Sequence, residues 1–138
     1  MRRKVLFLCT GNSCRSQMAE GLVNHHLGDR LKAYSAGTQP AGYVHPLAVQ
    51  VMDELGIDIS QHRSKPADAF YGLSFDEVIT VCDDAAENCP VWLGDGRKEH
   101  ISFQDPAQAT GSHEERLAEF RRVRDEIREA LSHHFMTE

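Results

Sequence analysis

The residues with the clearest chemical potential lie at positions 9–16, which read Cys-Thr-Gly-Asn-Ser-Cys-Arg-Ser and directly follow the apolar run 5–8. Cys9 and Arg15 are six positions apart, at an expected junction between a strand and a helix. A loop at such a junction can turn successive backbone N–H groups toward one anion, and the following helix adds the positive end of its dipole. The spacing therefore predicts an oxyanion-binding loop with a nucleophile at its base.

Each residue type in this loop has an expected role. Donors that bind a tetrahedral oxyanion also stabilise a thiolate, so Cys9 should ionise easily. The planar guanidinium of Arg15 can hold two oxygens at once. Gly11 and Asn12 tolerate the left-handed backbone that such a loop needs, and Ser16 could donate its hydroxyl to the sulfur. The expected oxyanion-binding residues are Thr10, Gly11, Asn12, Ser13, Cys14, Arg15 and Ser16.

The segment has two other possible interpretations. The plainer one is a buried cysteine at a strand end, followed by an ordinary turn. A nucleotide-binding P-loop is excluded, because the segment lacks the Gly-x4-Gly-Lys-Ser/Thr pattern. The apolar strand before the segment, the Gly-Asn pair inside it and the helix behind it favour the oxyanion loop over the turn.

Length, charge and cysteine content narrow the class of protein. The 138 residues predict a single domain over 1–138, and the net charge of −6 argues against non-specific binding of nucleic acid or anionic membranes. The apolar run after the basic N-terminus ends too early for a signal peptide, and no stretch is long enough to span a bilayer. We therefore expect a cytoplasmic protein. Thiols stay reduced there, so the four cysteines should be reactive or metal-binding rather than structural.

The elements that must position this chemistry follow from hydrophobic periodicity. An α/β fold is predicted, with a four-stranded parallel sheet and helices on both faces. The expected strands are 4–8, 32–36, 77–82 and 100–103, and the expected helices are 15–27, 46–56, a short one near 66–70, and 113–135.

Three reactive residues fall at or just after predicted strand ends, namely Cys9, Cys82 and Asp105. Parallel sheets bind ligands beyond the carboxyl ends of their strands, so these side chains can be neighbours despite their separation in sequence. A carboxyl group above an oxyanion loop could act as a general acid, and Pro106 would present the Asp105 carboxylate rigidly. The plainer interpretation is an Asp-Pro turn.

Cys82 and Cys89 enclose six residues, which is too many for a zinc knuckle. The histidine pairs at 25–26 and 133–134 are typical of an exposed surface rather than of ligands, so no zinc site is expected. Cys82 could be a small buried apolar side chain. Cys89, in a polar loop before Pro90, suits a cysteine that swings toward a strand-end cysteine for dithiol–disulfide exchange.

With these residues in place, the whole chain resembles the thioredoxin-coupled arsenate reductases, which share the fold of the low-molecular-weight tyrosine phosphatases. All four cysteines fall where that family has them. The resemblance implies the phosphatase-like three-layer sandwich, and we expect a monomer. It rests on the segments 9–21, 34–37, 58–62, 82–90, 105–106 and 120–127.

The resemblance also implies a reaction sequence. Cys9 attacks arsenate held by the loop amides and Arg15, and Asp105 protonates the leaving oxygen. Cys82 then attacks the Cys9 sulfur, so that arsenite leaves and a disulfide remains. Cys89 attacks Cys82, and thioredoxin reduces the resulting Cys82–Cys89 disulfide. No organic cofactor is needed, and the implied role is arsenic detoxification.

One position departs from the family pattern. Members that bind a potassium ion beside the loop do so with groups that match Asn12, Glu20 and Ser35, together with an acidic residue. Matching without gaps from 58–60 puts Lys65 at the acidic position. Its ammonium could occupy the place of the cation and pair with Glu20, so no metal is expected.

Two alternative functions use the same loop. A tyrosine phosphatase would need no second thiol, but that class usually places an aromatic residue directly after Asp-Pro, where this chain has Ala107. An anion-sensing or redox-sensing binding module would leave Asp105 and the ordered thiols without a role.

Overall fold

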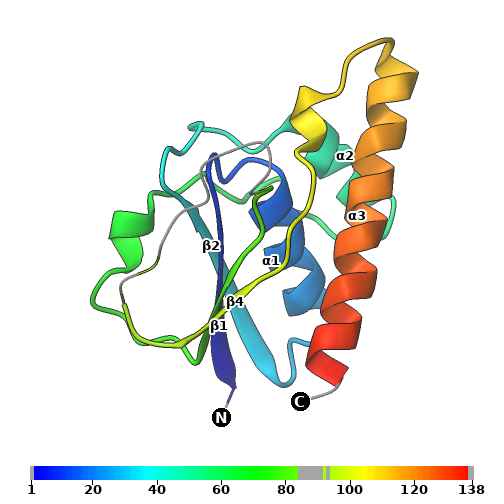
Figure 1. Ribbon diagram of the computed structural model, residues 1–138. Helices are drawn as coiled ribbons and strands as arrows, with labels where there is room; N and C mark the ends of the chain where they lie inside the picture. Colours follow the sequence, from blue (N-terminus) through cyan, green and yellow to red (C-terminus); the bar gives the residue numbers. More distant parts are fainter. Residues whose placement is uncertain (1, 84–91, 93, 137–138) are drawn as a thin grey trace.

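The computed structural model describes residues 2–83, 92 and 94–136. Strands and helices alternate along these residues, as the periodicity predicts (Figure 1). The strands are β1 (Arg3–Cys9), β2 (Leu31–Gly37), β3 (Glu77–Thr80) and β4 (Arg97–His100). The helices are α1 (Arg15–His26), α2 (Pro46–Asp53), α3 (His113–Met136) and two short 3-10 helices, η1 (Ala67–Phe70) and η2 (Pro106–Gln108).

The four strands form one parallel sheet in the order β2-β1-β3-β4. Strand β1 is central, and its residues 5–9 are buried, which explains its continuous apolar run. Its pairing with β2 runs from Arg3 opposite Leu31 to Cys9 opposite Gly37. The loops after β1, β3 and β4 therefore leave the sheet at the same edge.

Apolar side chains cover both faces of the sheet, but unequally. Val5 and Phe7 belong to a core cluster that includes residues from α1, α2 and α3. Leu6 and Leu8 point to the other face and join a smaller cluster that includes Phe70 of η1 and residues of neighbouring loops. Figure 1 shows the three α-helices on one side of the sheet and η1 on the other. The expected parallel sheet with helices on both faces is confirmed.

The fourth strand lies earlier than predicted. The sequence suggested 100–103, because that stretch contains apolar residues, but the strand is Arg97–His100 and all four of its residues are exposed. An edge strand covered on neither face needs no apolar side chains, so its charged sequence gave no strand pattern. Phe103 instead turns into the main core cluster, just before Asp105.

A charged cluster lies at the amino end of the sheet, opposite the loops described above. Glu77 is fully buried in β3, and its carboxylate bonds His134 Nε2 of α3. Arg97 Nη2 of β4 lies 3.3 Å from Glu77 Oε2, and Arg3 Nη2 of β1 lies 3.8 Å from Oε1. The expectation that His134 is a plain surface histidine is therefore wrong, because it pairs with the buried Glu77 carboxylate. The sequence pattern does not show this contact between distant residues.

None of the helices in the described part of the chain combines the length and apolarity that crossing a bilayer requires.

Candidate active site

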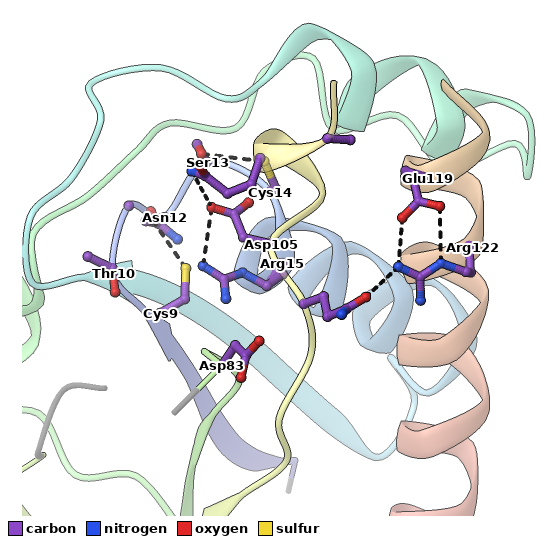
Figure 2. Close-up of a pocket in the computed structure, with 14 residues that line it drawn as sticks. Cys9, Thr10, Asn12, Ser13, Cys14, Arg15, Asp83, Asp105, Glu119 and Arg122 are labelled. Carbon is purple, nitrogen blue, oxygen red and sulfur yellow. Dashed lines mark hydrogen bonds and ion pairs between the residues drawn. The ribbon is translucent and has the colours of Figure 1, made fainter. Parts of the chain in front are cut away.

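A cavity of about 610 Å³ opens at the carboxyl ends of the strands (Figure 2). It brings Cys9 and Asp105 together, as the topology predicts, and Asp83, the residue after Cys82, also lines it. The remaining lining residues are Thr10, Gly11, Asn12, Ser13, Cys14, Arg15, Gln104, Gln108, Ala109, Glu119 and Arg122.

Cys9 lies at the base of this cavity with its sulfur among donors. The Asn12 backbone N–H donates to Cys9 Sγ over 3.2 Å, and Ser16 Oγ lies 2.9 Å from the same sulfur. Asn12 Nδ2 donates to Ser16 Oγ over 2.8 Å. Because the Ser16 oxygen already accepts from Asn12, its own hydrogen is available for a deprotonated sulfur.

The loop carbonyls are held away from Cys9 by bonds to the surrounding chain. The carbonyl of Asn12 accepts from Gln17 Nε2 over 3.2 Å. In a trans peptide the next N–H points opposite to the carbonyl, so anchoring these oxygens turns the N–H groups of residues 11–14 toward the anion position. Three further carbonyls accept backbone N–H groups from one external segment: Thr10 from Gln39 at 3.0 Å, Gly11 from Ala41 at 2.9 Å and Ser13 from His45 at 3.0 Å.

The backbone conformation of the loop depends on two residues. Asn12 has φ of 48°, in the left-handed region that asparagine tolerates. Gly11 is not among the glycines with positive φ, so of the two residues expected to tolerate left-handed backbone only Asn12 adopts it. The conformationally critical glycine is Gly37 at the end of β2, where an added Cβ would lie 2.5 Å from the Thr10 carbonyl oxygen. Close approach of β2 to the loop explains that glycine.

Arg15 and Asp105 face each other at the mouth of the cavity. Arg15 is 3% exposed, and its Nη1 donates to the Phe103 carbonyl over 3.2 Å. Its Nη2 lies 3.8 Å from Asp105 Oδ2, while Asp105 Oδ1 caps η2 by accepting the Ala107 N–H over 3.0 Å. The guanidinium is thus fixed to the segment that carries the carboxylate (Figure 2).

The two other described cysteines differ in state. Burial raises the pKa of Cys14 to about 12, despite a hydrogen bond with Ser13. Cys82 is fully buried and disulfide-bonded, whereas Cys9 and Cys14 are free, so neither of these two is its partner. Cys89 lies outside the described residues.

Lys65 lies where the sequence placed it, against the back of the loop. Its Nζ is 3.8 Å from Glu20 Oε1, which also accepts from Ser35 Oγ over 2.6 Å. The Lys65 backbone N–H donates to Asn12 Oδ1 over 2.8 Å. Burial lowers the pKa of Lys65, and the nearby Glu20 carboxylate acts in the opposite direction. In the described part of the chain, no group of three His, Cys, Asp or Glu side chains is arranged to hold a metal.

The sequence did not predict that Gln104, Glu119 and Arg122 line the cavity. Arg122 of α3 donates to Gln104 Oε1 and to Glu119 Oε2, both over 2.7 Å. The charged run around Arg122 has the pattern of an ordinary solvated helix face. The contact with Gln104 joins residues 18 positions apart, and no local spacing signals it.

Comparison with known proteins agrees with this geometry. A family model described as low molecular weight phosphotyrosine protein phosphatase matches residues 4–138. The arsenate reductase of Bacillus subtilis is 51% identical over 128 residues, which cover 92% of this chain and 91% of that protein.

Solved structures give the same result. A structure described as an arsenate reductase in the phosphate binding state superposes with a TM-score of 0.81 at 33% identity, covering 98% of both chains. A thioredoxin-dependent arsenate reductase of Corynebacterium glutamicum superposes with a TM-score of 0.66 at 27% identity, covering 99% of this chain and 64% of that one. The chain therefore belongs to the low molecular weight phosphotyrosine protein phosphatase family and, within it, to the arsenate reductases.

Proposed function

We propose that this protein reduces arsenate to arsenite with electrons from thioredoxin, in the service of arsenic detoxification. The observation that carries the proposal is the pairing of two features at neighbouring strand ends. Cys9 is a free thiol inside an oxyanion-binding loop, and Cys82, after the adjacent strand, is a cysteine engaged in a disulfide. A hydrolase that uses the same loop needs only the first feature.

The first step forms a bond between sulfur and arsenic. The Cys9 thiolate attacks the arsenic of an arsenate held by the inward N–H groups and by Arg15. Asp105 donates a proton to the leaving oxygen, which departs as water. The contact of 3.8 Å between Arg15 and Asp105 supports this assignment, because it places the acid beside the group that grips the oxyanion.

The second step transfers the electrons. The Cys82 sulfur attacks the Cys9 sulfur, the S–As bond breaks, and its electron pair stays on arsenic, which is reduced from As(V) to As(III). A Cys9–Cys82 disulfide remains. Cys89 then attacks Cys82, which frees Cys9, and reduced thioredoxin reduces the Cys82–Cys89 bond. A state with Cys9 free and Cys82 disulfide-bonded is the one this sequence leaves before thioredoxin acts.

Phosphatase activity is the second candidate, favoured by the family model. Phosphate and arsenate share shape and charge, so the first step should tolerate both. No aromatic side chain lines the cavity among the described residues, and the position after Asp-Pro is Ala107. A site without a surface to stack on a phenol ring supports the inorganic oxyanion as the main substrate.

The proposal includes further expectations about the chain as a whole. We take residues 1–138 to act as one domain and as a monomer in the cytoplasm, without an organic cofactor and without nucleic acid as a partner.

The test runs two assays on the same protein. Arsenate-dependent oxidation of NADPH is followed with thioredoxin and thioredoxin reductase, beside hydrolysis of an aryl phosphate. Cys9→Ser should lose both activities, and Cys82→Ser should lose arsenate turnover while it keeps slow hydrolysis. Cys14→Ser is the matched control and should keep both. Hydrolysis without arsenate-dependent NADPH oxidation in the wild type would instead establish the phosphatase.

A further inference from the structure

His45 connects the oxyanion loop to two helices, and the reaction described above gives it no role. Its backbone N–H donates to the Ser13 carbonyl over 3.0 Å. Its side chain caps α2, because Nδ1 accepts the Leu47 N–H over 3.1 Å. Its ring lies against Phe120 of α3, with the ring centroids 4.7 Å apart. One residue thus contacts the loop, α2 and α3.

The contact with Ser13 bears directly on oxyanion binding. Holding the Ser13 carbonyl outward turns the following N–H, that of Cys14, toward the anion position. The position of the His45 amide depends in turn on its own side chain, which is fixed by the cap on α2 and by the fully buried Phe120 ring. Loosening the imidazole would therefore loosen one of the external bonds that orient the loop.

The cap requires an uncharged ring. Nδ1 can accept the Leu47 N–H only without a proton of its own. A protonated ring would put an N–H against an N–H and a positive charge at the N-terminus of α2. Arg116 of α3 opposes that charge, Asp105 at the cavity mouth favours it, and the titratable ring of Tyr43 lies beside His45. Burial and Arg116 lower the pKa of His45 below its ordinary value of 6.5.

We propose that His45 is a positioning residue for oxyanion binding, and that its neutral imidazole holds the Ser13 end of the loop. Protonation of His45 releases this contact and weakens the affinity of the loop for a tetrahedral oxyanion. The inference rests on the proposed function only in taking the loop as the oxyanion site. It requires no electron transfer.

Sulfate is the probe, because it stays a dianion at neutral and mildly acidic pH, whereas arsenate itself titrates. Its dissociation constant is measured by NMR titration of the amides of residues 10–16. Between about pH 7.5 and about pH 5 the wild-type constant should rise, and it should reach about fivefold, the size of a lost helix cap, where the ring is fully protonated. His45→Asn keeps a capping acceptor that does not titrate, so its dissociation constant should lie within about threefold of the wild-type value at about pH 7.5 and should not rise in acid. His45→Ala should bind weakly at both pH values.

His62→Gln is the matched control, since His62 reaches the loop by another route, through Gln17. It should keep the wild-type weakening in acid. Sulfate that binds equally or more tightly in acid in the wild type would overturn the proposal, and so would an undiminished acid effect in His45→Asn. If His45→Ala fails to fold, the contrast between wild type and His45→Asn still decides. Arsenate-dependent NADPH oxidation, measured on the same samples, separates a failure of the proposed reaction from a failure of this inference.

Discussion

The two ends of the sheet use electrostatic attraction in opposite ways. At the amino end, the buried carboxylate of Glu77 is surrounded by His134 and by two arginines from β1 and β4. At the carboxyl end, Arg15 and the loop of residues 10–14 line a cavity of about 610 Å³. The anion of the first cluster is part of the chain, whereas the second cluster is built to take its anion from outside.

The difference shows how a protein separates stability from binding. In the amino-end cluster, half-exposed arginines and His134 pair with a carboxylate that is buried in the fold, so disrupting this pairing should destabilise the folded state. In the loop, the carbonyls are tied to the external segment and to Gln17, and the opposite side of each peptide is left to a ligand. Substitutions at the amino end should therefore change stability, and substitutions in the loop should change binding.

The largest expected effect is on binding, in Arg15→Lys. An ammonium cannot grip two oxygens as a planar guanidinium does, so the affinity for sulfate should fall about 100-fold. The dissociation constant of sulfate measures the change. Arg97→Lys, at the amino end, is the control and should bind as the wild type does. If Arg15→Lys binds sulfate within about threefold of the wild type, the Arg15 guanidinium does not hold two oxygens of the anion.

Glu77→Gln should do the reverse. Removing the charge that His134 and the two arginines share should lower the free energy of unfolding by about 2 kcal/mol. That corresponds to a fall of about 6 °C in Tm for a chain of this size. Sulfate affinity should stay at the wild-type value. Glu126→Gln removes an exposed partner of Arg122 and should change Tm much less. Equal losses in the two variants would show that burial of the carboxylate does not matter.

A smaller effect concerns potassium. The Lys65 ammonium lies beside Glu20, at the expected cation position. A potassium ion bound about 4 Å from this ammonium would be repelled by about 4 kcal/mol near a protein surface. The wild type should therefore melt at the same temperature and turn over at the same rate in sodium and in potassium at equal ionic strength. Lys65→Asp should show stabilisation specific to potassium. A potassium-specific gain in the wild type would contradict this reading of Lys65.

The smallest effect is on labelling of the loop cysteines. With a pKa of about 12, Cys14 stays protonated near neutrality and should resist iodoacetamide, while Cys9 is alkylated. Mass spectrometry of native protein after brief exposure measures both. Because folding favours the protonated form of Cys14, that contribution to stability is present below the ordinary pKa of 9.0 and is lost as the pH rises toward 12. Equal labelling of Cys9 and Cys14 would contradict the difference between them.

The site was largely predictable because its core is local. Cys9, Arg15 and Ser16 lie within eight consecutive residues after a buried strand, and a parallel sheet brings later strand ends to the same edge. The structure accordingly places Asp105 beside Arg15. The alternation of helices and strands likewise follows from periodic burial, which each element carries in its own sequence.

The failures have physical causes of three kinds. Strand β4 is exposed on both faces, so burial left no pattern in Arg97–His100. The pairings of His134 with Glu77 and of Arg122 with Gln104 depend on packing between distant elements, which no spacing records. The backbone of Gly11 illustrates a third limit, because residue type shows what a loop tolerates and not which residue takes the left-handed conformation.

The central claim is that Cys9, Cys82 and Cys89 deliver two electrons to arsenic while the disulfide moves from Cys9–Cys82 to Cys82–Cys89. Disulfide mapping after one turnover tests this claim most directly. Fully reduced protein receives one equivalent of arsenate without thioredoxin, and the bonds are identified by mass spectrometry. The wild type should hold a Cys82–Cys89 bond with Cys9 free, and Cys89→Ser should be trapped with a Cys9–Cys82 bond. A bond between Cys9 and Cys14, or arsenite formed without any new disulfide, would contradict the account.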